Sequence, residues 1–342
     1  MVIRLKSFLL AAALLTLPLI ASAQAPSAGP GSPRYATDAF PGFDRDDEPL
    51  EEGRKRPKWF GWFGGPSAET AAGQLDWCAA RAGAGDWKAA AKGYDALVRA
   101  WPHAEEAVWA QQRLAETLLA HLEYENAFYA YKYLTDYYSS ACDFDATVRR
   151  MYEAAKLMKE AGKRMLFFRF ANTIDVRRAF EAVVLRAPGA EYAPEALMTI
   201  ASLREDEYEY EKAVEVYESL RNLYPGTPQA KASVAREAKD RLCLLREHAY
   251  NRTRCLDTLG FIRMALADGV DAATRAELER ARAEATALLE DEAYKAAKFY
   301  DSKTRTRRSA ISAYEKFLRE HPGSSHVEEV RARLTELQQE VR

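Results

Sequence analysis

One spacing pattern recurs along this chain and constrains its fold more than any other feature. It is an aromatic residue, alanine three positions later, a second aromatic residue after four more, leucine or phenylalanine after three, and proline after five. Three copies are complete in frame, and the last begins at its alanine: Trp87, Ala90, Tyr94, Leu97 and Pro102; Tyr124, Ala127, Tyr131, Leu134 and Ser139 (serine replacing proline); Tyr210, Ala213, Tyr217, Leu220 and Pro225; Ala310, Tyr314, Phe317 and Pro322.

Offsets of three, four and seven place these side chains on one face of an α-helix. The alanine is small because another helix crosses close to it, and the proline ends the helix. Ala115 lies twelve residues before Ala127, and Ala201 lies twelve before Ala213, so each preceding helix carries its own small contact position. The pattern therefore predicts a series of helical hairpins.

The period predicts how these hairpins stack. Ala90 to Ala127 is 37 residues, close to the tetratricopeptide period of about 34. The interval from Ala127 to Ala213 is 86, which fits two repeats with an insertion near residues 163–172. A fifth pair over about 228–267 keeps helix-forming residues but loses the pattern. We therefore predict an all-α tetratricopeptide-type solenoid of five to six repeats over residues 67–342.

The N-terminus has the features of an export signal. Arg4 and Lys6 precede an apolar run of 13 residues, 8–20, and Ala21-Ser22-Ala23 follows as a cleavage site. The run is too short to cross a bilayer as a helix, which favours cleavage over an uncleaved anchor. We expect residues 1–23 to be a signal peptide and residues 24–66, rich in Pro, Gly and charge, to be a disordered linker that buries no core.

Four large aromatic residues, Trp59, Phe60, Trp62 and Phe63, interrupt that linker beside a basic run. One reading is a contact with a membrane surface or a partner, since such rings suit an interface. The other is that they fold back and cover the first helix pair, because terminal repeats need their apolar faces covered.

Catalytic and metal-binding patterns are missing from the sequence. The formal net charge is −2, so no basic excess points to nucleic acid. HExxH, GxSxG, a P-loop and CxxC do not occur, and repeats leave no room for a catalytic domain. We expect no enzyme activity, cofactor or metal. Cys243 and Cys255 lie at equal distance from an expected turn near Ala249, where they could form a disulfide or remain buried thiols.

A protein-binding surface is the better expectation. The first helix of each pair lines the inner curve of such a solenoid. The repeat frame places seven residues there: Trp109, Gln112 and Glu116 in the second repeat, and Glu195, Met198, Ser202 and Glu205 in the fourth. A segment of a partner protein would suit this surface. The alternative for Trp109 is packing against the adjacent pair.

The last repeat resembles the BamD family, tetratricopeptide lipoproteins of the outer-membrane β-barrel assembly machinery. The matching residues are Ala297, Phe299, Tyr300, Ala310, Ile311 and Tyr314. The resemblance covers roughly residues 70–340. It implies a periplasmic, outer-membrane-associated scaffold whose partners are the barrel-insertion protein and barrel precursors. One departure is that Ala-Ser-Ala-Gln stands where the family has its lipid-bearing cysteine, and the first cysteine is Cys78.

Two other functions compete with this one. Envelope proteins that coordinate cell-wall synthesis and division carry similar repeats, but often with an N-terminal coiled coil that this sequence lacks before residue 70. The helical superstructure of a cell-wall lytic enzyme would need a catalytic domain, for which no residues remain.

Overall fold

The computed structural model describes residues 40–43, 65–164, 173–247, 251–302 and 307–341. Within these ranges it contains thirteen α-helices and no β-strand. They are α1 (Ala71–Gly83), α2 (Trp87–Ala100), α3 (Glu105–Ala120), α4 (Tyr124–Tyr137), α5 (Phe144–Arg164), α6 (Thr173–Arg186), α7 (Ala193–Asp206), α8 (Tyr210–Leu223), α9 (Pro228–Glu247), α10 (Arg252–Ala267), α11 (Ala272–Asp301), α12 (Arg307–Glu320) and α13 (Val327–Val341). The predicted all-α, tetratricopeptide-type fold is confirmed: α1 to α12 form six consecutive pairs, and α13 closes the C-terminus.

The residues of the recurring pattern form the core between the paired helices. The alanine, the second aromatic residue and the following leucine or phenylalanine are buried in all four copies: Ala90, Tyr94, Leu97, Ala127, Tyr131, Leu134, Ala213, Tyr217, Leu220, Ala310, Tyr314 and Phe317. The first aromatic residues, Trp87, Tyr124 and Tyr210, are half-buried. The prolines stand two residues beyond the ends of their helices, at Pro102, Pro225 and Pro322. The pattern thus sets both the buried face and the end of each second helix.

Equivalent polar contacts also repeat. The Tyr138 hydroxyl donates a hydrogen bond of 2.7 Å to the carbonyl of Pro102, one repeat earlier. The Tyr224 hydroxyl donates to the carbonyl of Pro188 across the same 36-residue separation. Each bond satisfies a carbonyl in the turn after a second helix, and so fixes the spacing between consecutive repeats.

The turn inside a helix pair has one geometry in three repeats. Gly85, Leu122 and Tyr208 each adopt positive φ, at 79°, 65° and 61°. At each turn the next residue's N–H reaches the carbonyl five positions back, as from Glu123 to Leu118. This is the Schellman ending, which glycine normally occupies because it has no Cβ.

Buried charges cross-link the helices of the N-terminal repeats. Asp136 in α4 accepts from Arg186 in α6 at 2.7 Å and from Lys132 at 2.8 Å. Burial alone would raise the pKa of the Asp136 carboxyl, but the Arg186 and Lys132 charges outweigh burial and lower this pKa.

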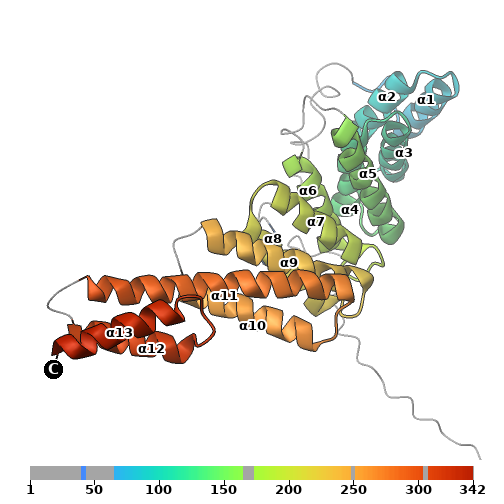
Figure 1. The fold of residues 1–342 in the computed structure, drawn as a ribbon. Helices are drawn as coiled ribbons and strands as arrows, with labels where there is room; N and C mark the ends of the chain where they lie inside the picture. The colour runs from blue at the N-terminus through green and yellow to red at the C-terminus, as the bar shows by residue number, and fades with distance from the viewer. Residues whose placement is uncertain (1–39, 44–64, 165–172, 248–250, 303–306, 342) are drawn as a thin grey trace, which may run out of the picture.

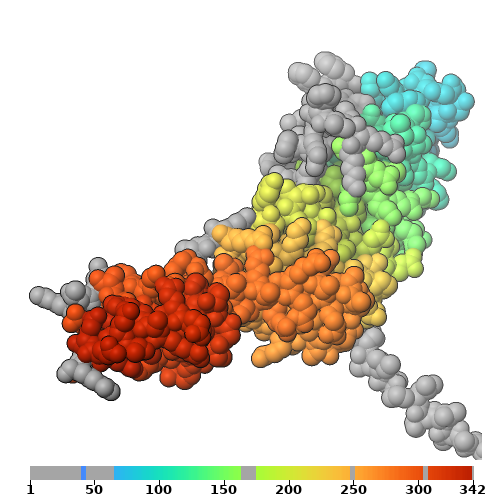
Figure 2. Space-filling view, viewed as in Figure 1, coloured from blue at the N-terminus to red at the C-terminus, as the bar shows by residue number. Residues whose placement is uncertain are grey.

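The helix pairs form two arms that meet at an angle (Figures 1 and 2). A single core runs through α1–α8 into the start of α9, a second core joins α9, α10 and the first half of α11, and a third joins the second half of α11 to α12 and α13. With 30 residues, α11 is about 45 Å long and belongs to both the second and third cores. The fifth pair, at 228–267 in sequence, stands at the bend.

Two expectations about the flanking features need correction. Phe40 and Phe43 lie in the stretch expected to bury nothing, yet both are buried in the first core, because a tight turn stacks their rings. Cys243 and Cys255 do not form a disulfide: all four cysteines are thiols, and Cys255 is buried in α10 whereas Cys243 is half-buried in α9. Residues 1–23 and the aromatic residues Trp59, Phe60, Trp62 and Phe63 lie outside the described residues.

Candidate functional site

The first helices of the second, third and fourth pairs share one register. Ala115, Ala155 and Ala201 are fully buried at equivalent positions of α3, α5 and α7. The offsets between them are 40 and 46 residues. The same offsets carry Trp109 to Arg149 and then to Glu195, and all three of these side chains are exposed.

The residues predicted on α3 lie on its solvent-facing side. The side chain of Trp109 is 59% exposed, so it does not pack against the adjacent pair. Gln112 is exposed and donates to the Glu116 carboxylate at 3.0 Å, and Arg113 donates to the same carboxylate. This face therefore offers one large ring among polar groups that are paired only weakly with one another.

The four residues predicted on α7 divide into two sets. Glu195 is exposed, and Met198 packs partly against the core. Ser202 and Glu205 are both hydrogen-bonded by Arg236 of α9, at 3.1 and 2.5 Å. Glu205 also accepts from the buried Tyr217 hydroxyl. Ser202 and Glu205 thus join the fourth repeat to the fifth.

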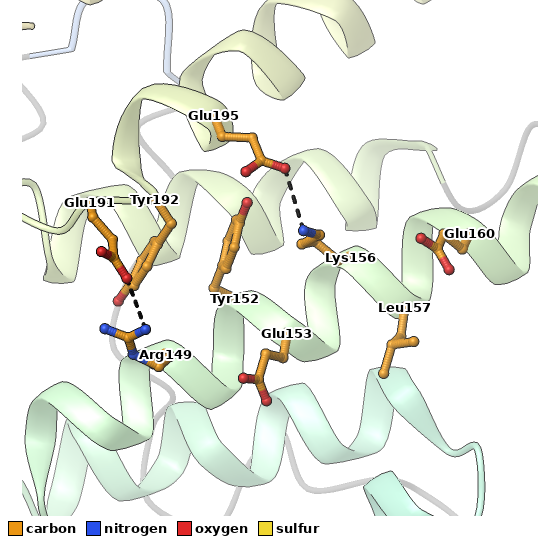
Figure 3. Close-up of a pocket in the computed structure, with 9 residues that line it drawn as sticks. All are labelled: Arg149, Tyr152, Glu153, Lys156, Leu157, Glu160, Glu191, Tyr192 and Glu195. Carbon is orange, nitrogen blue, oxygen red and sulfur yellow. Dashed lines mark hydrogen bonds and ion pairs between the residues drawn. The ribbon is translucent and has the colours of Figure 1, made fainter. Parts of the chain in front are cut away.

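A pocket of about 760 Å³ lies between α5 and α7 (Figure 3). Its lining comes from α5, from the turn before α7 and from the first turn of α7: Arg149, Tyr152, Glu153, Lys156, Leu157, Glu160, Glu191, Tyr192 and Glu195. Of the predicted surface residues, only Glu195 lines it. Sequence reasoning missed the α5 residues because the third repeat lacks the aromatic pattern, although aligning Ala155 with Ala115 and Ala201 would have found them.

Two stacked tyrosines form the wall of the pocket. The rings of Tyr152 and Tyr192 lie 4.6 Å apart and nearly parallel, at 13°. Arg149 lies over the Tyr192 ring at 5.8 Å and Lys156 over the Tyr152 ring at 5.3 Å. The stack joins the third repeat to the fourth and holds the two cations at the pocket mouth.

Ion pairs bridge the pocket from α5 to the α7 side. Arg149 pairs with Glu191 at 3.0 Å, and Lys156 pairs with Glu195 at 3.4 Å. Both pairs are solvent-exposed, and such pairs contribute only about 0–1 kcal/mol. A charged segment of a partner could therefore replace either side of these pairs at little cost.

The Tyr152 side chain is directed toward the Glu195 carboxylate (Figure 3). Burial, together with the nearby Glu195 carboxylate, raises the pKa of Tyr152, and burial raises the pKa of Tyr192 to about 12. Both phenols are therefore neutral donors at physiological pH.

A second pocket of about 580 Å³ lies at the bend, between the turn after α8 and the turn after α10. Its Phe261 ring lies near two guanidinium groups, those of Arg221 at 5.0 Å and Arg241 at 4.9 Å from the ring centroid. Both guanidinium groups also pair with the Glu237 carboxylate, so the cations beside this ring are already engaged within the chain.

Within the described ranges, no three or more His, Cys, Asp or Glu side chains gather as a metal site. None of the helices described there has the length and apolarity needed to cross a membrane.

Comparison with known proteins found one family match and matches to solved structures. The tetratricopeptide repeat family matches residues 195–227, which are the fourth pair. A tetratricopeptide repeat protein from Parabacteroides merdae is 14% identical and covers 79% of this chain and 100% of its own, with a TM-score of 0.28. A putative kinesin light chain with TPR-like repeats from Podosopora anserina is 14% identical and covers 59% and 98%, with a TM-score of 0.28.

No curated protein matches the sequence. Tetratricopeptide repeats are in general non-enzymatic modules that bind other proteins. The chain therefore carries a tetratricopeptide repeat at 195–227 and is a helical solenoid of the tetratricopeptide type, a scaffold for protein–protein interaction.

Proposed function

We propose that this protein is an exported, non-enzymatic scaffold of the periplasm that holds a segment of a partner protein against α3, α5 and α7. The observation that carries the proposal is the common register of these three helices. Trp109 is exposed on α3, the Tyr152–Tyr192 stack joins α5 to the turn before α7, and Glu195 is exposed on α7. A large ring and neutral phenolic donors are the groups that dominate binding energy at protein interfaces.

The chemistry of the surface indicates what would bind. The pocket walls carry two cations and four carboxylates, and the cations are paired with Glu191 and Glu195. A partner segment with an apolar or aromatic side chain for the tyrosine stack, an acceptor for Tyr152 and a basic group for Glu195 would satisfy every group named here. The polar backbone of this segment would lie against Gln112, Arg113 and Glu116 of α3, whose side chains are paired only weakly with one another.

The BamD resemblance of the last repeat suggests the identity of the partner. On that basis the scaffold assists assembly of β-barrel proteins at the outer membrane, binding the barrel-insertion protein and barrel precursors. Attachment to the membrane without a lipid-bearing cysteine would then depend on the aromatic residues at 59–63. Washing membranes in low salt tests this attachment, because release of the mature protein would contradict it.

The deciding experiment is a pull-down from envelope extract with the full chain as bait. Recovery of the barrel-insertion protein supports the proposal, and recovery of cell-wall synthases alone would replace it with a role in cell-wall coordination. The purified protein should also leave peptidoglycan uncleaved, because cleavage would favour the lytic-enzyme alternative.

Matched variants connect the binding to this surface. Trp109→Ala combined with Tyr152→Phe should reduce recovery of the partner at least about tenfold, as expected for loss of a central anchor. Leu256→Ala removes an exposed apolar side chain from α10, away from the pocket, and should leave recovery unchanged. Equal recovery with all baits would place the interaction elsewhere.

A further inference from the structure

Residues 40–43 form a compact turn that is separated in sequence from every helix. The Phe43 N–H donates to the Phe40 carbonyl at 3.1 Å, with Pro41 and Gly42 at the centre of the turn. The two phenyl rings stack at 4.9 Å and 15°. Their exposures are only 4% and 6%, so the turn presents both rings to the solenoid and not to water.

The turn sits on α8 so closely that its third residue must be glycine. A Cβ added at Gly42 would lie 2.6 Å from both the Lys212 carbonyl oxygen and a methyl carbon of Val216. Cβ atoms essentially never lie so close to another atom. Because the carbonyl is part of the helix backbone, it cannot move aside as the end of a flexible side chain could. Val216 is itself 1% exposed. The surface of α8 beneath this turn therefore accommodates only glycine at position 42.

A buried arginine donates a hydrogen bond to the backbone of the turn. The Arg204 guanidinium, at the end of α7, donates to the Gly42 carbonyl at 2.9 Å. It is held there by Glu181 of α6 at 3.0 Å and by Glu209 at the start of α8. Burial alone would raise the pKa of Glu209, but hydrogen bonds from Arg204 and Lys212 outweigh it and lower this pKa.

These features are those of a peptide-recognition site: two aromatic side chains buried together, one position limited to glycine, and a preorganised cation for a main-chain carbonyl. We propose that residues 40–43 are an internal ligand. Their Phe-Pro-Gly-Phe turn occupies a peptide site on α7 and α8 and closes it to partner peptides of the same aromatic-Pro-Gly-aromatic chemistry. The site shares no residue with the α5–α7 pocket, so it does not depend on the proposed function.

The test uses the full chain and a labelled synthetic peptide with the sequence of residues 37–46. Wild-type protein should bind the peptide weakly, because the tethered copy competes at an effective concentration of about 1 mM. Gly42→Ala should open the site through the clash with Lys212. Fluorescence anisotropy should then show binding at least about tenfold tighter than to the wild type.

Three controls make the result decisive. The Phe40→Ser and Phe43→Ser double variant opens the same site by a different route and should behave like Gly42→Ala. A peptide carrying the glycine-to-alanine change should bind none of the proteins. Gly83→Ala, where an added methyl meets open space, should behave like wild type. Equal binding of the peptide to wild type and to both opened variants, or no binding to either opened variant at about 1 mM, would overturn the proposal.

Discussion

The Schellman turns inside the helix pairs allow a prediction whose sign and size follow from backbone geometry. Gly85, Leu122 and Tyr208 occupy equivalent positions with positive φ, but only the first repeat has glycine there. The left-handed conformation costs an L-residue about 1–2 kcal/mol. Replacement by glycine removes that cost but adds about 0.5–1 kcal/mol of unfolded-state entropy. We expect Leu122→Gly to stabilise the fold by about 0.5–1 kcal/mol.

Leu122 is the better of the two positions for this test. Its side chain is 71% exposed, so its removal sacrifices little buried surface. Tyr208 is 75% exposed but contacts Tyr210 edge to face at 6.3 Å, which partly offsets the gain in Tyr208→Gly. For a folded region of about 270 residues, 1 kcal/mol corresponds to about 2 °C in the thermal midpoint. Circular dichroism should therefore show a rise of about 1–2 °C for Leu122→Gly.

Two matched variants separate backbone strain from loss of the side chain. Leu122→Ala removes most of the side chain but keeps the strain, so it should not raise the midpoint. Gly85→Leu introduces the strain where an added Cβ meets nothing within 4 Å, so it should lower the midpoint by a similar amount. The reasoning is wrong if Leu122→Ala stabilises as much as Leu122→Gly, or if Gly85→Leu has no effect.

Three other features give predictions of their own. Gly93→Ala should destabilise by about 1–3 kcal/mol in denaturant titrations because its Cβ would lie 2.5 Å from the Cys78 sulfur, whereas Gly260→Ala, in open space within α10, should stabilise by about 0.5–1 kcal/mol. Asp136→Asn should cost about 3–5 kcal/mol at neutral pH. Because the folded pKa of Asp136 is lowered, the wild-type advantage should persist above the unfolded pKa of about 3.9 and vanish as pH falls through the folded value. Burial raises the pKa of Cys78 to about 11 and also raises that of Cys255, so a thiol reagent should label neither until the protein is unfolded; labelling of either in native protein would contradict their burial.

The repeat core was predictable from sequence because one physical requirement recurs in one frame. A small residue at a helix crossing and a large ring beside it satisfy the same packing geometry in every copy, so Ala90 and Tyr94 predict Ala213 and Tyr217. The bounds of the fifth pair, about 228–267, followed from its helix-forming residues. The position of this pair at the bend could not be predicted from the sequence, because the angle between repeats depends on packing between nonequivalent faces.

The candidate site was predictable only in part. Trp109 and Glu195 lie on the predicted surface because the frame holds in α3 and α7. Arg149 and Tyr152 escaped prediction because the third repeat replaces the aromatic pattern with Met and Val core residues. Glu205 was predicted to be exposed on the binding surface. In the structure Arg236, 31 residues later in the sequence, donates a hydrogen bond to the Glu205 carboxylate and covers it. Such long-range partners leave no periodic trace in a single sequence.

The length of α11 raises the question of how the second and third cores are coupled. Its Leu278, Ala281 and Ala285 belong to the second core, whereas Tyr294 and Ala297 belong to the third. Since both cores share this helix, continuity of its hydrogen bonds should carry much of their coupling, together with the ion pair between Arg252 of α10 and Glu320 of α12.

Ala287 lies between the two cores on the exposed side of α11, so a change there alters the helix without altering either core. Ala287→Pro removes a backbone hydrogen bond and costs about 3 kcal/mol, whereas Ala287→Gly costs about 1 kcal/mol. In the proline variant, hydrogen exchange should accelerate in α12 and α13, while the amides of α1–α8 keep wild-type rates. The glycine variant should show the same pattern more weakly. Equal acceleration throughout the chain would instead mean that both arms unfold as one cooperative unit.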